Sequence, residues 1–142
     1  MSTYRILHVE DEPDIREVVK LALTLDPEIT VKSCGNGTDA LAEAASWLPD
    51  MIVSDVVMPA MDGPQLLARL RDDARTAAIP VVFMTARAQT SAIESLLALG
   101  AAGVMAKPFD PLTLAKSLRA CVAGRSARRE EPGLQCIANP QR

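Results

Sequence analysis

The stretch MIVSDVVMPAMDG, from Met51 to Gly63, guides the interpretation of the whole chain. Its apolar start lies between Pro49 and Pro59 and is too short for a globular helix, so it predicts a buried parallel strand. Asp55 then lies at the carboxyl end of that strand, which is the edge of an open α/β sheet where ligands bind. An Asp before a turn can instead hydrogen-bond its own backbone. The role of Asp55 therefore depends on what else reaches this edge.

Apolar segments with strand character alternate with amphipathic segments of helical spacing through most of the chain. The predicted strands cover residues 4–9, 29–34, 51–53, 79–84 and 103–106. A helix is predicted after each of them, and Thr38 can cap the second helix. Strands and helices in strict alternation with short connections imply a parallel sheet with right-handed crossovers and helices on both faces. The expected fold class is α/β with a doubly wound, five-stranded parallel sheet.

The composition fits one domain with a well-filled core. The chain has 142 residues, of which 49% are hydrophobic and only 3% are aromatic, so aliphatic side chains must do the packing. From residue 124 onward charged residues, Pro and Gly mix without periodicity. We therefore expect the folded domain over residues 1–123 and a mobile C-terminal tail over residues 124–142.

Charge and hydropathy argue against several classes of partner. A net charge of -3 disfavours direct binding to nucleic acid, which needs a basic face to neutralise phosphates. No apolar run is long enough for a signal peptide or a membrane span. We therefore expect a cytoplasmic protein that contacts neither nucleic acid nor membrane.

The cysteines and the histidine do not form a recognisable metal or disulfide pattern. Cys34, Cys121 and Cys136 are odd in number and widely spaced, which predicts free thiols. His8 is the only histidine and lies inside an apolar strand pattern, so we interpret it as structural rather than as a ligand.

Polar residues follow four of the five predicted strands, and parallel strands bring their carboxyl ends to one edge. These residues are Glu10, Asp11, Asp55, Thr85 and Lys107. Taken alone, the acidic run from residue 10 to 12 could simply be a charged helix start. Three carboxylates at one edge repel each other unless a cation lies between them, and oxygen ligands with room for water suit Mg²⁺. A metal and a Lys beside a carboxylate are the groups that phosphoryl transfer needs, because the metal and the Lys neutralise phosphoryl oxygens while the carboxylate attacks phosphorus. Asp55 is the plausible nucleophile.

At these residues the sequence resembles the receiver domains of bacterial two-component response regulators, close to the chemotaxis-type single-domain members. The resemblance covers roughly residues 4 to 123. It depends on four motifs in a fixed order, which are ILHVEDE, SDVVMPAMDG, FMTA and AKPF. It implies a flavodoxin-like sheet of strand order 2-1-3-4-5 and a cis peptide before Pro108.

The resemblance also implies roles for the residues at this edge. Asp55 would accept a phosphoryl group from a histidine kinase or phosphotransfer protein, and Thr85 and Lys107 would contact the acyl phosphate. Mg²⁺ would be held by Glu10, Asp11, Asp55 and the backbone carbonyl of Val57. The product would be a signalling switch rather than an enzyme acting on other substrates. Its output would pass to an unknown protein target, and a homodimer could form through the fourth helix, fifth strand and fifth helix.

Four positions depart from the family pattern or modulate it. Glu10 replaces the commoner Asp, and a longer carboxylate can still reach the metal. Val104 stands where the family usually carries a Tyr or Phe that swings inward on activation. Arg87 and Val57 flank the phosphoryl site at positions that affect how fast it hydrolyses.

Two other functions fit parts of this pattern, and each lacks a feature that it needs. A small aspartyl-phosphate hydrolase typically carries a second Asp two residues after the nucleophile, whereas Val57 stands there in this chain. A flavin-binding relative of the fold needs a phosphate-cradling loop after the first strand, and the EDEPD segment would repel that phosphate.

Overall fold

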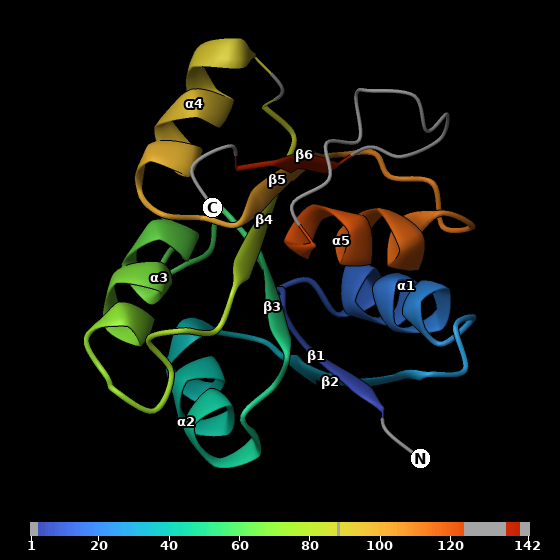
Figure 1. Ribbon diagram of the computed structural model, residues 1–142, viewed down its shortest axis with the longest axis horizontal. Coiled ribbons are helices and arrows are strands. Elements are labelled where there is room, and N and C mark those ends of the chain that lie inside the picture. Colours follow the sequence, from blue (N-terminus) through green and yellow to red (C-terminus); the bar gives the residue numbers. More distant parts are fainter. Residues whose placement is uncertain (1–2, 88, 124–135, 140–142) are drawn as a thin grey trace.

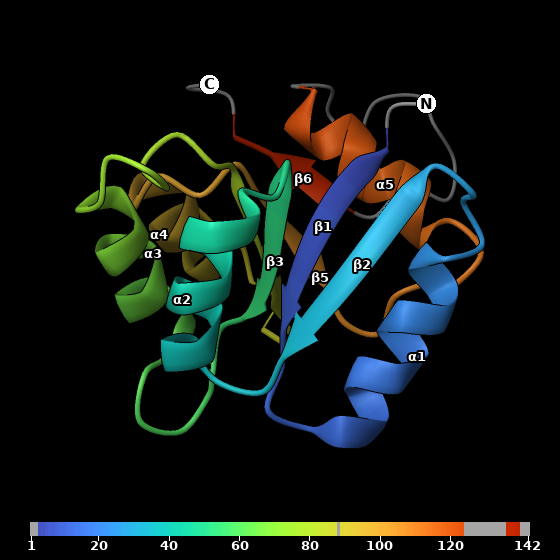
Figure 2. The ribbon, with the colours of Figure 1, turned by 90° about the horizontal axis from the view of Figure 1, so that it is seen from below.

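A sheet of six strands forms the centre of the computed structural model, which describes residues 3–87, 89–123 and 136–139 (Figure 1). The strands are β1 (Tyr4–Val9), β2 (Ile29–Cys34), β3 (Met51–Asp55), β4 (Val81–Thr85), β5 (Gly103–Ala106) and β6 (Cys136–Ala138). Their spatial order is β2-β1-β3-β4-β5-β6, in which the first five are parallel and β6 is antiparallel to β5. Figure 2 shows β1, β2 and β3 running in the same direction. The predicted fold class and strand order 2-1-3-4-5 are confirmed, with one strand added.

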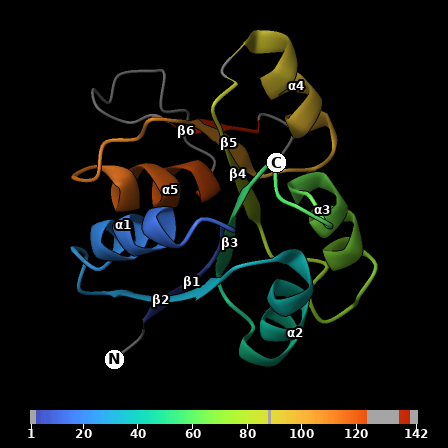
Figure 3. The same cartoon turned by 180° about the vertical axis from the view of Figure 1, so that it is seen from behind.

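Helices cover both faces of this sheet, as doubly wound crossovers require. They are α1 (Pro13–Leu23), α2 (Gly37–Trp47), α3 (Gly63–Arg71), α4 (Thr90–Ala98) and α5 (Leu114–Val122). α1 and α5 pack on one face, and α2, α3 and α4 pack on the other (Figures 1 and 3).

Each face of the sheet has its own apolar core because side chains alternate along a strand. Ile6 packs with the helices α1 and α5, and its neighbour Leu7 packs with α2 and α3. Phe83 of β4 is fully buried on the second side. Parallel strands buried on both faces read as continuous apolar runs, which is why the sequence revealed them.

The helix that follows the β3 loop begins at a complete capping box. The Asp62 carboxylate accepts a hydrogen bond from the Gln65 amide at 2.8 Å, and the Gln65 side chain accepts one from the Asp62 amide at 2.9 Å. α2 begins two residues earlier than predicted, because Asn36 rather than Thr38 is its N-cap and accepts from the Asp39 amide at 2.8 Å. Asn and Thr are both good caps, so composition alone did not separate them.

The expected tail is wrong over residues 136–138, which form β6 on the outer edge of β5. Residues 124–135 and 140–142 lie outside the described residues, so the predicted mobile tail and the domain boundary at residue 123 stay predictions there. A three-residue strand with no alternation gives no sequence signal, because its formation depends on a long-range partner.

The prediction of three free thiols is also wrong. Cys121 of α5 and Cys136 of β6 form a disulfide, with their Cα atoms 5.8 Å apart. Cys34 is free. An odd number of widely spaced cysteines does not reveal which two meet in the fold.

None of the helices in the described part of the chain is long and apolar enough to cross a membrane.

Candidate functional site

The carboxyl ends of the parallel strands bring the predicted polar residues together at one edge of the sheet. Asp55 is the last residue of β3 and Thr85 is the last residue of β4. Glu10 and Asp11 directly follow β1, and Lys107 directly follows β5. The register sets these strand ends side by side, with Asp55 paired to Met84 and Thr85 paired to Ala106. The predicted edge is therefore present.

Three carboxylates and one ammonium group form the centre of this edge. Carboxylate oxygens of Glu10, Asp11 and Asp55 all lie within 4.8 Å of one another. Lys107 Nζ lies 3.0 Å from Asp55 Oδ1 and 3.6 Å from Glu10 Oε1. One positive charge therefore faces up to three negative ones.

Burial and the neighbouring charges shift the pKa values of Glu10 and Lys107 in this cluster. Glu10 is only 2% exposed, and its pKa is raised first by burial and then by the neighbouring Asp55 charge, against the lowering effect of Lys107. Burial alone would lower the pKa of Lys107, but its hydrogen bond to Asp55 and the charges of Asp55 and Glu10 raise that pKa overall. The Asp55 charge contributes to both pKa shifts, while burial is the largest cause of the Glu10 shift.

The Lys107 ammonium and the Val56 amide both bind the Asp55 carboxylate and so hold its orientation. Asp55 Oδ1 accepts from Lys107 Nζ at 3.0 Å and from the Val56 amide at 3.1 Å. Gly63 lets the next helix start directly against this strand end, because a side chain there would lie 2.6 Å from the Asp55 carbonyl oxygen and 2.8 Å from the Phe83 ring. The residue after the loop is therefore restricted to glycine by close packing.

Thr85 and Val57 lie at the rim of the site. The Thr85 side chain is nearly buried, and its Oγ1 accepts from the Arg87 amide at 2.9 Å. The Val57 side chain is 76% exposed, as expected for a residue of the β3–α3 loop that would contribute only its backbone. Lys107 is linked to Thr85 because its amide donates to the Thr85 carbonyl at 2.8 Å.

The donor set fits a divalent cation of the hard, oxygen-binding kind. The site offers carboxylate oxygens from three residues on two strand ends, and a single ammonium cannot balance them. Mg²⁺ binds through one or two carboxylates and keeps several waters, which matches such an open acidic cluster. The cluster is consistent with the metal site of a receiver domain.

Sequence reasoning missed one supporting residue and gave no indication of the hydrogen bonding of another. Arg16 of α1 donates from Nη1 to the Glu10 carbonyl at 2.7 Å and so ties α1 to the acidic strand end. An exposed-looking Arg in a helix gives no signal for this. His8 is 1% exposed, and neither ring nitrogen has a hydrogen-bond partner within the described part of the chain, so its interpretation as a structural residue stays a prediction.

Comparison with known proteins agrees with this geometry. The family model of the response regulator receiver domain matches residues 6–119. The solved structure of the chemotaxis response regulator CheY4 of Vibrio cholerae superposes with a TM-score of 0.78 at 32% identity, covering 84% of this chain and 99% of that one. Protein PilH of Pseudomonas aeruginosa is 37% identical over 84% of this chain and 98% of its own length.

Other relatives are longer. Response regulator Rre1 of Synechocystis is 38% identical over 86% of this chain, but only 53% of Rre1 is covered. The chain thus spans about half the length of several curated relatives that it matches. Receiver domains are signalling modules of two-component systems rather than classical enzymes, and they interact with histidine kinases. With the match over residues 6–119 and the acidic cluster typical of the phosphorylation site, the chain belongs to the response regulator receiver domain family.

Proposed function

We propose that this protein is a phosphoacceptor response regulator. It takes a phosphoryl group from a histidine kinase or phosphotransfer protein onto Asp55 in a Mg²⁺-dependent reaction, and the modified site switches a protein-binding surface. The observation that carries the proposal is the meeting of three carboxylates within 4.8 Å of one another beside Lys107, whose Nζ lies 3.0 Å from Asp55.

Asp55 is the nucleophile in this proposal. Among the described residues, both hydrogen bonds to its carboxylate end on Oδ1, so Oδ2 is the oxygen that attacks phosphorus. The new O–P bond forms as the P–N bond of the donor's phosphoimidazole breaks, and the leaving nitrogen keeps the electron pair. Lys107 balances the charge that gathers on the phosphoryl oxygens.

Glu10, Asp11, Asp55 and the backbone carbonyl of Val57 would hold Mg²⁺. The bound metal would neutralise phosphoryl oxygens and help to fix the donor in line. The Glu12 amide donates to Glu10 Oε2 at 3.3 Å and so holds the Glu10 carboxylate, while Arg16 binds the backbone carbonyl of the same residue.

Thr85 and Lys107 would bind the phosphoryl group once it is attached to Asp55. A phosphoryl oxygen is a charged acceptor, and a hydrogen bond to it is roughly twice as strong as a neutral one. We expect the Thr85 side chain to turn toward the phosphoryl group as it donates this bond, which would draw Oγ1 away from the Arg87 amide that now donates to it at 2.9 Å. The backbone after β4 would move with it and shift the start of α4.

The output partner is an unidentified protein, and direct binding of nucleic acid or membrane is not part of the proposal. A homodimer through α4, β5 and α5 is one form that this output could take. Because β6 covers the outer edge of β5, such a dimer would form over β6 or after its displacement. A cytoplasmic location is the setting we propose for this exchange with a kinase.

Incubation with Mg²⁺ and a small phosphodonor tests the proposed function. We expect at most one phosphoryl group per chain, acid-stable and alkali-labile, on the peptide that contains Asp55, and no labelling in EDTA. Mass spectrometry of the intact chain and of its peptides measures both. Equal labelling in EDTA, or continuous turnover of phosphate esters in place of a single adduct, would contradict the proposal and favour the hydrolase alternative.

The route of the signal gives a second prediction. Val104 is 1% exposed and lies opposite Ile137 of β6, and a β-branched side chain has little χ1 freedom, so we expect it to keep its rotamer on activation. Beryllofluoride with Mg²⁺ should instead shift the NMR signals of Ala86, Arg87 and the first turn of α4 most strongly. Dominant shifts at Val104 with silence at Ala86 and Arg87 would show that the signal travels by another path.

A further inference from the structure

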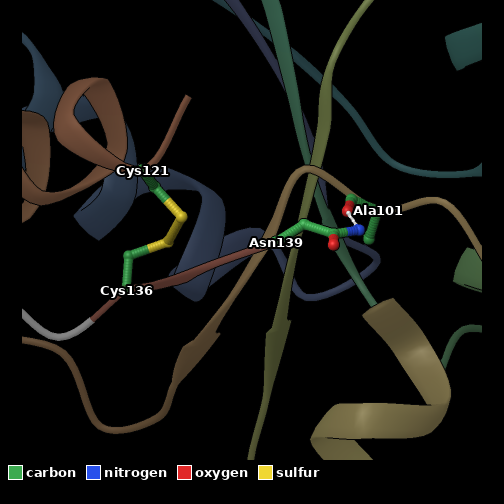
Figure 4. The surroundings of a disulfide bond; sticks show 4 residues. All are labelled: Ala101, Cys121, Cys136 and Asn139. Carbon is green, nitrogen blue, oxygen red and sulfur yellow. Dashed lines mark hydrogen bonds between the residues drawn. A yellow bond between two sulfur atoms is a disulfide. The ribbon is translucent and has the colours of Figure 1, made fainter. Parts of the chain in front are cut away.

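Residues 136–139 cover one side of the molecule that is separate from the acidic edge. β6 pairs antiparallel with β5, with Met105 opposite Cys136 and Gly103 opposite Ala138. The segment passes between α5 on one side of the sheet and α4 on the other (Figures 1 and 4). β5 would otherwise be an edge strand with unpaired backbone groups.

Two anchors, one at each end, hold this segment. At one end Cys136 is bonded to Cys121 of α5 (Figure 4). At the other end the Asn139 side chain donates from Nδ2 to the Ala101 carbonyl at 2.7 Å and the Leu97 carbonyl at 3.0 Å, and its amide donates to the Ala102 carbonyl at 2.8 Å. The carbonyl of Leu97 belongs to the last turn of α4, so β6 ties this helix to α5.

The disulfide fills space that a glycine leaves open. A side chain at Gly103 would collide with Cys121 Sγ, and it would lie 2.8 Å from the Ile137 carbonyl oxygen and 3.3 Å from Cys136 Sγ. Both cysteines are at most 1% exposed, so this region has little spare room. Two thiol sulfurs cannot stay at the distance of a covalent S–S bond. Reduction therefore requires the two sulfurs to separate, and the close packing around them favours a movement of Cys136 together with β6.

β6 is also too short to stay in place easily without this bond. It contributes three residues to the sheet, and Cys121 and Cys136 are 15 positions apart in the sequence. Closing a loop of this length without a cross-link disfavours docking on the order of a hundredfold. The covalent bond removes that penalty.

We propose that the Cys121–Cys136 disulfide is a redox-sensitive clasp that keeps β6 over the edge of β5, and that reduction releases residues 136–139. The reductant is a dithiol. One of its thiolates attacks a cysteine sulfur when β6 opens transiently, the S–S bond breaks, and a mixed disulfide forms. The second thiol of the donor then displaces the remaining cysteine, so that the donor ends as a disulfide and both cysteines end as thiols after taking up protons. The clasp acts without Asp55 and is independent of the proposed phosphorylation.

Hydrogen exchange on the full chain tests the clasp. The Cys34→Ser variant provides the working background, because it removes the free cysteine and leaves only the pair. In this background thiol titration should find no free thiol before treatment and both thiols after treatment with dithiothreitol. Exchange at the Ile137 and Asn139 amides should then accelerate by about tenfold or more, while core amides such as that of Val53 keep their rates.

Two variants sharpen the result. Cys136→Ser in the same background should exchange like the reduced protein whether or not dithiol is present. The Cys34→Ser protein itself should match the untreated wild type, which excludes an effect of Cys34. Free thiols at Cys121 and Cys136 in the untreated protein would overturn the proposal. Full reduction that leaves the Ile137 and Asn139 amides protected would also overturn it, as would full reduction that accelerates exchange equally throughout the sheet. The wild type treated with dithiol gives this result even if the Cys136→Ser variant fails to fold.

Discussion

Replacing Asp55 with asparagine is expected to reduce phosphoryl incorporation by on the order of 10³-fold or more, which is the effect of removing a nucleophile. The amide has nearly the same shape and keeps an oxygen that can accept from Lys107 and Val56, as Oδ1 does at 3.0 and 3.1 Å. Its nitrogen and carbonyl oxygen are much weaker nucleophiles than a carboxylate. The loss should therefore be chemical and should leave the fold intact.

Phosphorylation by a small phosphodonor, followed by intact-mass measurement, gives the extent of labelling. Asp72→Asn is the matched control, because Asp72 is exposed at the C-terminal end of α3 and should label like the wild type. Thermal melting of Asp55→Asn shows whether the variant is folded. Undiminished labelling of a folded Asp55→Asn protein would mean that another residue accepts the phosphoryl group.

The same variant should lower the pKa of its neighbour Glu10. The pKa of Glu10 is raised first by burial and then by the charge of Asp55, so removing that charge should lower the Glu10 pKa while the contribution of burial stays. The acidic edge therefore behaves as one electrostatic unit. This coupling is what a bound cation, or a phosphoryl group next to Lys107, would act upon.

How much of this could be foreseen depends on whether a feature is local or long-range. The convergence of Glu10, Asp11, Asp55, Thr85 and Lys107 was predictable, because each follows an apolar run and parallel strands end at one edge. The capping box at Asp62 is likewise a local pattern of the kind that sequence reveals.

The contacts around Cys136 could not be foreseen. The pairing of β6 with β5 and the bond to Cys121 join residues with no shared periodicity, and three cysteines can pair in several ways. The surroundings of His8 were missed for a related reason. A histidine in an apolar run indicates that the residue is buried, but it does not show whether its ring nitrogens find hydrogen-bond partners.

His8 should make the folded state strongly sensitive to acid. Burial, followed by the positive charges of Lys107 and Arg16, lowers the pKa of His8 from 6.5 to about 3. Between these two values the unfolded chain binds a proton that the folded chain does not, so stability falls as the pH falls through this window. From pH 6.5 to pH 4 the loss from this group is about 3 kcal/mol, at about 1.4 kcal/mol per pH unit. That is a large share of the ~5–15 kcal/mol that holds a typical domain.

His8→Leu tests this because the chain has no other histidine. At pH 7 the variant should be about as stable as the wild type or more so, since the buried ring has no hydrogen-bond partner within the described residues. At pH 4 it should be more stable by about 3 kcal/mol, because leucine takes up no proton on unfolding.

Denaturant unfolding at both pH values, without Mg²⁺ and at constant ionic strength, measures the difference. Carboxylates titrate in both proteins, so their contribution to the pH dependence cancels in the comparison. Glu12→Gln, at an exposed position before α1, is the control, and its stability should follow the wild-type pH dependence. If His8→Leu and the wild type lost stability in parallel between pH 7 and pH 4, the acid sensitivity would have to come from the carboxylates and not from the buried imidazole.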